Sequence, residues 1–305
     1  MVKGRVINLN GGVYKVLLEN GTTLELKARG KLRATKVRQE NNKAISRKAE
    51  IQTIKLSPKV GDIVNIDNDM IISFDERKNS LVRPDIANVD QILLVFAAKK
   101  PDFSYYLLDL FLTIIKSNNI DTVIVISKVD LLTDSELKEL KTNMEYYEKL
   151  GYKVLFVDSL NKSGIDKVDE ILEGKITILS GQTGAGKSTL INSLIPDFNL
   201  QTQEISNALG RGKHTTREIN LYSYHNGFIG DTPGFSKLDI SLIEKEKLKD
   251  LFIEFKNYHC KFSDCNHMPN IKGCMVHNAY QSGEILKTRY EDYIKMLKGV
   301  TELWN

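Results

Sequence analysis

Residues 181–188 read Gly181-Gln182-Thr183-Gly184-Ala185-Gly186-Lys187-Ser188, a glycine-rich pattern that ends in Gly-Lys-Ser. The apolar segment 176–179 before it predicts a strand, and the segment 188–194 after it predicts a helix. A loop in this context turns backbone N–H groups and a helix N-terminus toward a phosphate. We therefore expect a nucleotide here, with Lys187 bridging its β- and γ-phosphates, Ser188 ligating Mg²⁺ and Thr189 also in the binding site.

A second motif, Ser127-Lys128-Val129-Asp130, follows the apolar segment 122–126. The Asp130 carboxylate can accept two hydrogen bonds from the N1 and N2 edge of guanine, which adenine cannot offer. We expect Lys128 to cover the base and the phosphate loop. The usual GTPase pattern begins with Asn, so Ser127 predicts weaker base contacts. A plain polar turn is the alternative interpretation.

The order of these two motifs is the reverse of that in most GTPases, because the guanine motif here precedes the phosphate loop. The sequence therefore predicts a nucleotide site of the GTPase type, assembled from a circularly permuted chain. After the apolar segment 155–157, Ser159 and Leu160 stand where a backbone contact to the guanine oxygen is expected.

Two further motifs follow the phosphate loop. The first is Asp231-Thr232-Pro233-Gly234, where Asp231 can reach Mg²⁺ and the Gly234 N–H can reach the γ-phosphate. The second is Gly210-Arg211-Gly212-Lys213-His214-Thr215-Thr216, in which Thr216, rather than Thr215, is expected to complete the Mg²⁺ shell. Phe235 stands where many GTPases place a water-orienting glutamine, so we predict slow intrinsic hydrolysis. His214 is then the candidate in this chain for orienting the attacking water, and a polar loop histidine is the alternative.

The pattern of short strands predicts a small barrel in residues 1–80, and an OB-type barrel is the natural candidate. Segments 6–9, 12–18, 22–26 and 62–66 supply its strands, with a hairpin at Asn20-Gly21 and a loop over 34–50. Residues 81–240 then alternate strands with helices over 104–116, 135–150 and 165–172, which predicts a mostly parallel α/β sheet. Residues 241–305 are expected to be helical, with helices over 242–256 and 284–297.

All three cysteines, Cys260, Cys265 and Cys274, lie in one short stretch that also holds His267. Their odd number argues against a complete set of disulfides, and the histidine argues for a metal site. A chance cluster of reduced thiols is the alternative.

The net charge of +4 decides little, but basic side chains crowd residues 27–48. That stretch is either a solvated loop or a surface for nucleic-acid phosphates, and the sequence favours neither. The longest apolar run, residues 92–98, is too short to span a membrane, and the N-terminus shows no signal segment. We expect a cytoplasmic protein with no membrane contact, and a monomer because coiled-coil heptads are absent.

Taken together, the chain resembles the circularly permuted, ribosome-small-subunit-dependent GTPase A family of bacteria. The resemblance covers nearly the whole length. It is carried by the reversed motif order, by residues 210–216, and by Arg83-Pro84 with Ala87-Asn88-Val89-Asp90-Gln91. It implies an OB-fold, a permuted GTPase domain and a C-terminal zinc domain. It also implies a Zn²⁺ site of Cys260, Cys265, His267 and Cys274, for which His277 is a less favoured alternative ligand and His259 a still weaker one.

The resemblance further implies binding to the small ribosomal subunit and its rRNA, and a role in late subunit maturation. We therefore expect a GTPase that hydrolyses GTP to GDP and phosphate with turnover stimulated by the subunit. An RNA-binding scaffold with a mainly structural nucleotide pocket is the competing hypothesis. An ATP-using enzyme is disfavoured by Asp130.

Overall fold

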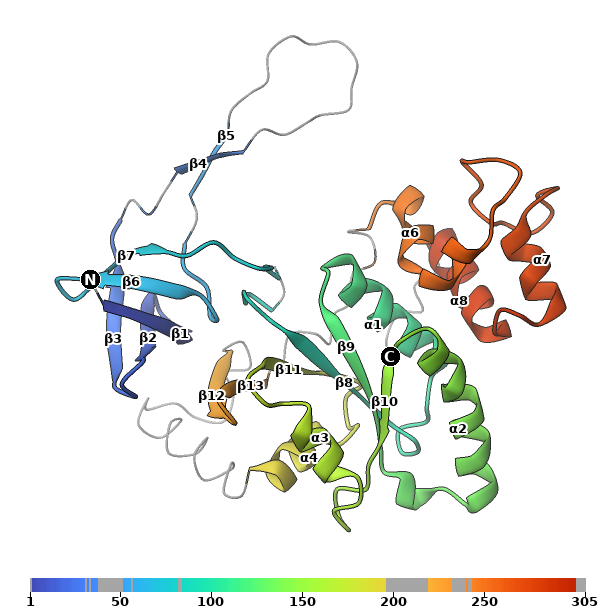
Figure 1. Ribbon diagram of the computed structural model, residues 1–305, viewed down its shortest axis with the longest axis horizontal. Coiled ribbons are helices and arrows are strands. Elements are labelled where there is room, and N and C mark those ends of the chain that lie inside the picture. The colour runs from blue at the N-terminus through green and yellow to red at the C-terminus, as the bar shows by residue number, and fades with distance from the viewer. Residues whose placement is uncertain are drawn as a thin grey trace, which may run out of the picture.

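The structure is a computed structural model that describes residues 2–30, 32, 34–37, 52–55, 57–81, 84–195, 219–231, 240 and 243–299. A β-barrel, an α/β sheet and a helical C-terminal region follow one another along the chain (Figure 1). No helix within these ranges is long and apolar enough to cross a membrane.

The N-terminal barrel is closed because its last strand returns to its first. The strands lie in the order β1-β2-β3-β7-β6, and β6 pairs with β1. Alternate side chains point inward, so that Val6, Val16, Val64 and Ile71 are fully buried. The strands are β1 (Val2–Asn10), β2 (Val13–Leu18), β3 (Thr23–Ala28), β6 (Ile63–Asp67) and β7 (Met70–Phe74).

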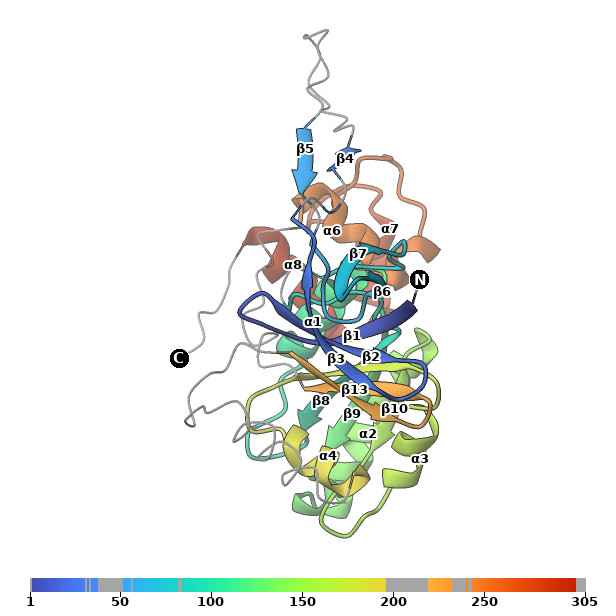
Figure 2. The same ribbon diagram turned by 90° about the vertical axis from the view of Figure 1, so that its left-hand side faces the viewer.

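The expected hairpin between β2 and β3 forms. Its Asn-Gly turn does not have a positive φ at both residues. Only Gly21 in this turn has a positive φ, of +83°. Asn20 instead uses its side-chain oxygen to accept a hydrogen bond of 2.9 Å from the N–H of Thr22. The predicted loop over 34–50 begins as a strand, because β4 (Ala34–Val37) pairs with β5 (Gln52–Lys55) in a two-stranded sheet that projects from the barrel (Figures 1 and 2).

The central sheet has the order β10-β9-β8-β11-β13-β12, and all its neighbours except β12 and β13 pair in parallel. Continuous apolar runs predict strands that are covered on both faces, and β8 is buried along its whole length. The strands are β8 (Gln91–Ala97), β9 (Asp121–Ser127), β10 (Lys153–Phe156), β11 (Ile176–Gly181), β12 (Asn220–Tyr224) and β13 (Gly227–Asp231). The sequence pattern did not predict β7 or β12.

Among the described residues, two helices cover each face of this sheet. Alternate residues of β8 separate into two apolar clusters, with Leu94 on the side of α1 and α2 and Leu93 on the side of α3 and α4. Ser104 caps α1 through a hydrogen bond from the N–H of Leu107, and Thr133 with Glu136 forms a capping box at α2. The helices are α1 (Tyr105–Ser117), α2 (Asp134–Lys149), α3 (Ile165–Glu170) and α4 (Lys187–Leu194).

The helix predicted over 242–256 is interrupted. Phe252 adopts an extended conformation between α6 and the short helix η4, and its side chain is fully buried. The ring lies 4.4 Å below the Arg289 guanidinium and 5.1 Å from the Tyr293 ring, so tertiary packing outweighs local helical preference. The C-terminal elements are α6 (Lys245–Leu251), η4 (Ile253–Asn257), α7 (Met275–Ser282), which the sequence pattern did not predict, and α8 (Lys287–Lys298).

A buried arginine joins the C-terminal region to the central sheet. Arg289 of α8 is 1% exposed and donates hydrogen bonds of 2.8 Å to Asp109 of α1 and 2.8 Å to Glu254 of η4. Tyr147 of α2 also donates to Asp109, at 2.8 Å. One guanidinium therefore holds α1, η4 and α8 together. We call this group of Arg289, Asp109, Glu254 and Tyr147 the Arg289 hub.

Candidate functional site

The phosphate loop leaves β11 at a position where only glycine fits. Gly181 has a φ of +122°, and a Cβ there would lie 2.1 Å from the carbonyl oxygen of Val95 on the neighbouring strand. The loop then closes with Gly186, at a φ of +87°, as the N-cap of α4. The first N–H groups of α4 have no partner within the helix, so the loop presents backbone donors at the C-terminal end of a parallel strand.

The lysine of this loop lies within hydrogen-bond distance of the loop backbone. The Lys187 ammonium donates to the carbonyl oxygens of Gly181 at 3.1 Å and Gln182 at 2.8 Å. Thr183, Ser188 and Thr189 are exposed, whereas Ala185 is buried. A positive charge and exposed hydroxyls at a helix start are the groups that a phosphate with Mg²⁺ requires.

The guanine motif lies directly against the phosphate loop. Lys128 adopts a left-handed φ of +56°, and its ammonium donates to the carbonyl oxygens of Gly184 at 2.7 Å and Lys100 at 2.5 Å. The Ser127 hydroxyl donates to the carbonyl oxygen of Ala185 at 2.5 Å. The sheet thus brings together two motifs that the chain visits in reversed order.

Asp130 lies in the short helix η1 (Val129–Leu131), and its side chain is exposed. The other predicted base-contacting turn is held by Asp158, whose carboxylate accepts hydrogen bonds from the N–H groups of Leu160 at 2.9 Å and Asn161 at 3.1 Å. The Ser193 hydroxyl oxygen of α4 lies 3.1 Å from the Ser159 carbonyl oxygen and 2.9 Å from the Thr189 carbonyl oxygen of its own helix. This turn therefore lies against the helix that follows the phosphate loop.

The remaining predicted residues are placed only in part. The backbone of Asp231 ends β13 and pairs with Leu179 of β11, two residues before Gly181. His214, Thr216 and Gly234 lie outside the described residues.

A third loop contacts the phosphate loop, and sequence reasoning did not identify it. It joins β8 to α1. Its Lys100 carbonyl accepts from Lys128, and its Asp102 carbonyl accepts from the Gln182 amide at 3.1 Å. These contacts use backbone oxygens, which leave no residue-type signal in the sequence. The loop continues directly into α1, the helix that carries Asp109.

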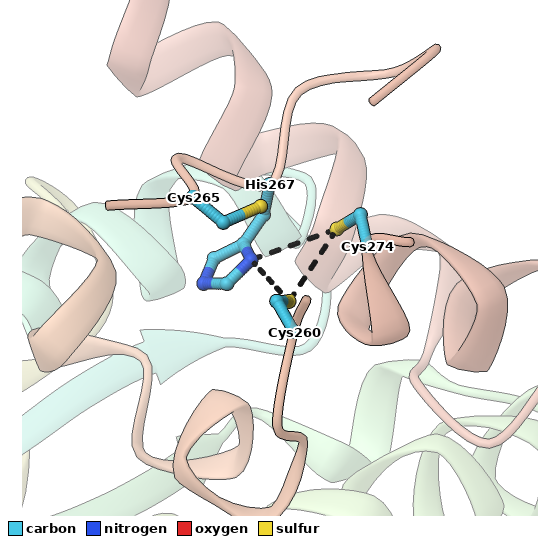
Figure 3. A group of neighbouring side chains, drawn as sticks. All are labelled: Cys260, Cys265, His267 and Cys274. Atoms are coloured by element: carbon cyan, nitrogen blue, oxygen red, sulfur yellow. Dashed lines mark hydrogen bonds between the residues drawn. The ribbon is translucent and has the colours of Figure 1, made fainter. Parts of the chain in front are cut away.

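The four predicted zinc ligands converge in the C-terminal region (Figure 3). Cys260 Sγ lies 3.9 Å from Cys274 Sγ and 3.5 Å from His267 Nδ1, and the ligand atoms of all four residues lie within 4.8 Å of one another. Sulfur atoms bound about 2.3 Å from one tetrahedral zinc ion would lie about 3.8 Å apart. The spacing therefore fits a closed site of three thiolates and one imidazole.

The surroundings of this cluster suit ligation. Burial, with a smaller contribution from the nearby Lys249 ammonium, lowers the pKa of His267 to about 4, so the imidazole is neutral at pH 7. The N–H groups of Met275 and His277 donate to the sulfur atoms of Cys260 and Cys274, each at 3.3 Å. The Nδ1 atom of His277 lies 3.0 Å from the Tyr290 hydroxyl oxygen, within hydrogen-bond distance. His277 and His259 are both outside the cluster. Three thiols this close repel one another once ionised, which a divalent cation would relieve.

Comparisons with known proteins agree over the whole chain. A family model described as RsgA GTPase matches residues 74–241. A protein named small ribosomal subunit biogenesis GTPase RsgA from Phytoplasma australiense is 43% identical, with 98% of this chain and 97% of the relative covered. Its namesake from Geobacillus kaustophilus is 39% identical, with 99% and 98% covered.

Two solved structures are similar as well. YjeQ from Thermotoga maritima has a TM-score of 0.77 and 34% identity, with 98% of each chain covered. YloQ, described as a circularly permuted GTPase, has a TM-score of 0.76 and 29% identity, with 100% of this chain and 96% of the other covered.

Proposed function

The chain belongs to the RsgA GTPase family, and on that premise we propose that it acts in the biogenesis of the small ribosomal subunit, with GTP turnover stimulated by the subunit. The observation that carries this proposal is the contact of Ser127 and Lys128 with the phosphate loop. This contact supports a single pocket that contains both a guanine-reading motif and a phosphate-binding motif, as a circularly permuted GTPase requires.

Within this pocket we assign roles by chemistry. Asp130 accepts hydrogen bonds from the guanine edge, and the turn at Ser159 and Leu160 lies beside the base. Lys187 and the loop 181–189 bind the phosphates. Mg²⁺ would be held by Ser188, Asp231 and Thr216, and would neutralise charge on the β- and γ-phosphate oxygens.

Hydrolysis transfers the γ-phosphoryl group to water and releases GDP. Water attacks the γ-phosphorus as the bond to the bridging oxygen breaks, and the protein contributes mainly position and charge. The Gly234 N–H would stabilise the γ-phosphate, and His214 would orient the water. Because Phe235 cannot polarise water, we propose that the ribosomal subunit completes this arrangement.

The flanking regions would contact RNA. We propose a division into an RNA-binding OB-fold over 1–80, the GTPase over 81–240 and a zinc-binding region over 241–305. Zn²⁺ on Cys260, Cys265, His267 and Cys274 would be structural, because a closed four-ligand site leaves no position for a substrate. We further propose that the protein is a cytoplasmic monomer that contacts rRNA through basic surfaces.

The test is GTP turnover by the full chain with and without purified small subunits. We expect clear stimulation, and its loss in Lys187→Ala, which lacks the phosphate-binding cation. Basal turnover that subunits do not change would instead support the scaffold hypothesis.

A second variant, His214→Ala, tests the catalytic assignment. General acid–base or water-orienting groups contribute roughly 10²–10⁴-fold, so subunit-stimulated turnover should fall by about that factor while GDP affinity is retained. Turnover near that of the wild type would remove His214 from the mechanism.

A further inference from the structure

Ser127 stands where most GTPases have an asparagine, and its surroundings show what the replacement changes. It is the last residue of β9 and is 2% exposed. Its hydroxyl oxygen lies 2.5 Å from the Ala185 carbonyl oxygen and 3.2 Å from the Phe96 carbonyl oxygen. Both neighbours are acceptors, so the hydroxyl serves here as a donor.

A serine hydroxyl has one hydrogen to donate, whereas an asparagine amide has two. The shorter contact commits that hydrogen to Ala185 of the phosphate loop. The N7 and O6 atoms of guanine are acceptors and would each need a donor. Once bound to Ala185, Ser127 has no hydrogen left for either atom, and its burial leaves little surface for a base to contact.

The neighbouring residue, Lys128, makes a second contact between the guanine motif and the phosphate loop. Lys128 donates to Gly184, directly before Ala185 in the phosphate loop, at 2.7 Å. Two consecutive residues of the guanine motif are thus fastened to two consecutive residues of the phosphate loop. Their spacing fixes how far the base-binding end of the pocket lies from its phosphate-binding end.

We propose that Ser127 is a positioning residue that sets the distance between the guanine motif and the phosphate loop, and that guanine N7 receives no hydrogen bond from this motif. Selection of guanine then depends on the Asp130 carboxylate at the N1 and N2 edge. This inference rests on the proposed nucleotide pocket, and it assigns to Ser127 a role different from base contact.

The experiment measures the affinities of the full-length protein for GDP, 7-deaza-GDP and IDP, which lacks the N2 amino group. The wild type should bind GDP and 7-deaza-GDP within about twofold, and IDP about tenfold or more weakly, because Asp130 loses one charged hydrogen bond. This comparison needs no variant. If 7-deaza-GDP binds about tenfold more weakly than GDP, guanine N7 is recognised and the proposal is wrong.

Variants then test the positioning role. Ser127→Ala leaves the Ala185 carbonyl without its donor, so the affinities for all three nucleotides should fall by the same factor, about tenfold. Ser127→Thr keeps the hydroxyl and should restore them to within about threefold. A change in the ratio of GDP to 7-deaza-GDP affinity in Ser127→Ala would contradict the proposal, because a positioning residue acts on all bases alike.

The matched control is Ser180→Ala. Ser180 is also a buried serine at the end of a central strand, but within the described residues its hydroxyl has no hydrogen-bond partner. Its substitution should leave all three affinities within about twofold, and a loss equal to that of Ser127→Ala would contradict a specific role for Ser127. A wild type that binds no guanine nucleotide would instead overturn the proposed function itself.

Discussion

The metal cluster and the nucleotide pocket are built in opposite ways. The four side chains that could hold a metal ion come from residues 260–274, a single short segment. The proposed nucleotide pocket combines loops that follow β8, β9 and β11, which are neighbours in space but widely separated along the chain. A local site should fail locally when it is damaged, whereas a site made by a sheet depends on how the strands are held together.

The helix α1 connects the loops of the proposed nucleotide pocket to the C-terminal region that holds the cysteine cluster. It begins after the loop whose Lys100 and Asp102 carbonyls contact the nucleotide pocket, and it carries Asp109 into the Arg289 hub. In Figure 1, α1 lies between the central sheet and α8. The following predictions test how far each site is independent of the other, starting with the largest effect.

Loss of a metal ligand should have the largest effect and should remain local. Cys274→Ser replaces a thiolate with a weak ligand, so zinc affinity should fall by at least about a hundredfold. The affinity for GDP should stay within about threefold, because no pocket residue lies in this segment. Metal content after dialysis and GDP titration provide the two measurements.

His259→Ala is the matched control for the metal site, since this histidine adjoins Cys260 but is outside the cluster. It should retain one zinc ion per chain. If Cys274→Ser also retained its zinc, the four-ligand site would be wrong.

Breaking the Arg289 hub should have the next largest effect. Arg289→Met leaves Asp109 and Glu254 buried without their cation, which costs about 3–5 kcal/mol of unfolding free energy. Lys287→Met, on the same helix, removes an exposed pair with Glu291 at 3.9 Å and should change the unfolding free energy by about 0.5 kcal/mol or less. Urea unfolding compares the two variants, and equal losses would mean that the hub does not join the regions.

The pH dependence of stability should also report on the hub. Burial, with a smaller contribution from Asp292, raises the pKa of Asp109 to about 7 against the attraction of Arg289. A carboxyl whose pKa is higher in the folded than in the unfolded state stabilises the fold at low pH. This contribution is complete below pH 4 and is lost as the pH rises through 7, by at most about 1.4 kcal/mol per pH unit.

Asp109→Asn removes this titration. The unfolding free energy of the variant, measured relative to that of the wild type, should therefore rise by roughly 3 kcal/mol between pH 5 and pH 8. Unfolding in urea at both pH values checks it. If the difference in unfolding free energy between the variant and the wild type were the same at both pH values, the pKa of Asp109 would not lie between 5 and 8.

The contrast between a site within one segment and a site built from distant loops explains what the sequence could predict. The convergence of Cys260, Cys265, His267 and Cys274 was predictable because these residues lie within one segment, and the strands β8, β9 and β11 were predictable because their apolar runs are continuous. The Arg289 hub was not predicted, since a lone arginine in a polar helix gives no sign of burial. The break at Phe252, the loop at Lys100 and the strand β12 also depend on partners distant in sequence.

The most direct test of a single guanosine pocket is the preference of Asp130→Asn for GDP or XDP. Xanthine carries an oxygen where guanine has the N2 amino group, so an asparagine amide can donate to it while its carbonyl accepts from N1. The account predicts that the preference inverts from GDP to XDP by about a hundredfold or more, and that adding Lys187→Ala weakens the binding of XDP. An unchanged preference for GDP, or XDP binding that ignores Lys187, would show that Asp130 and the phosphate loop do not hold the same nucleotide.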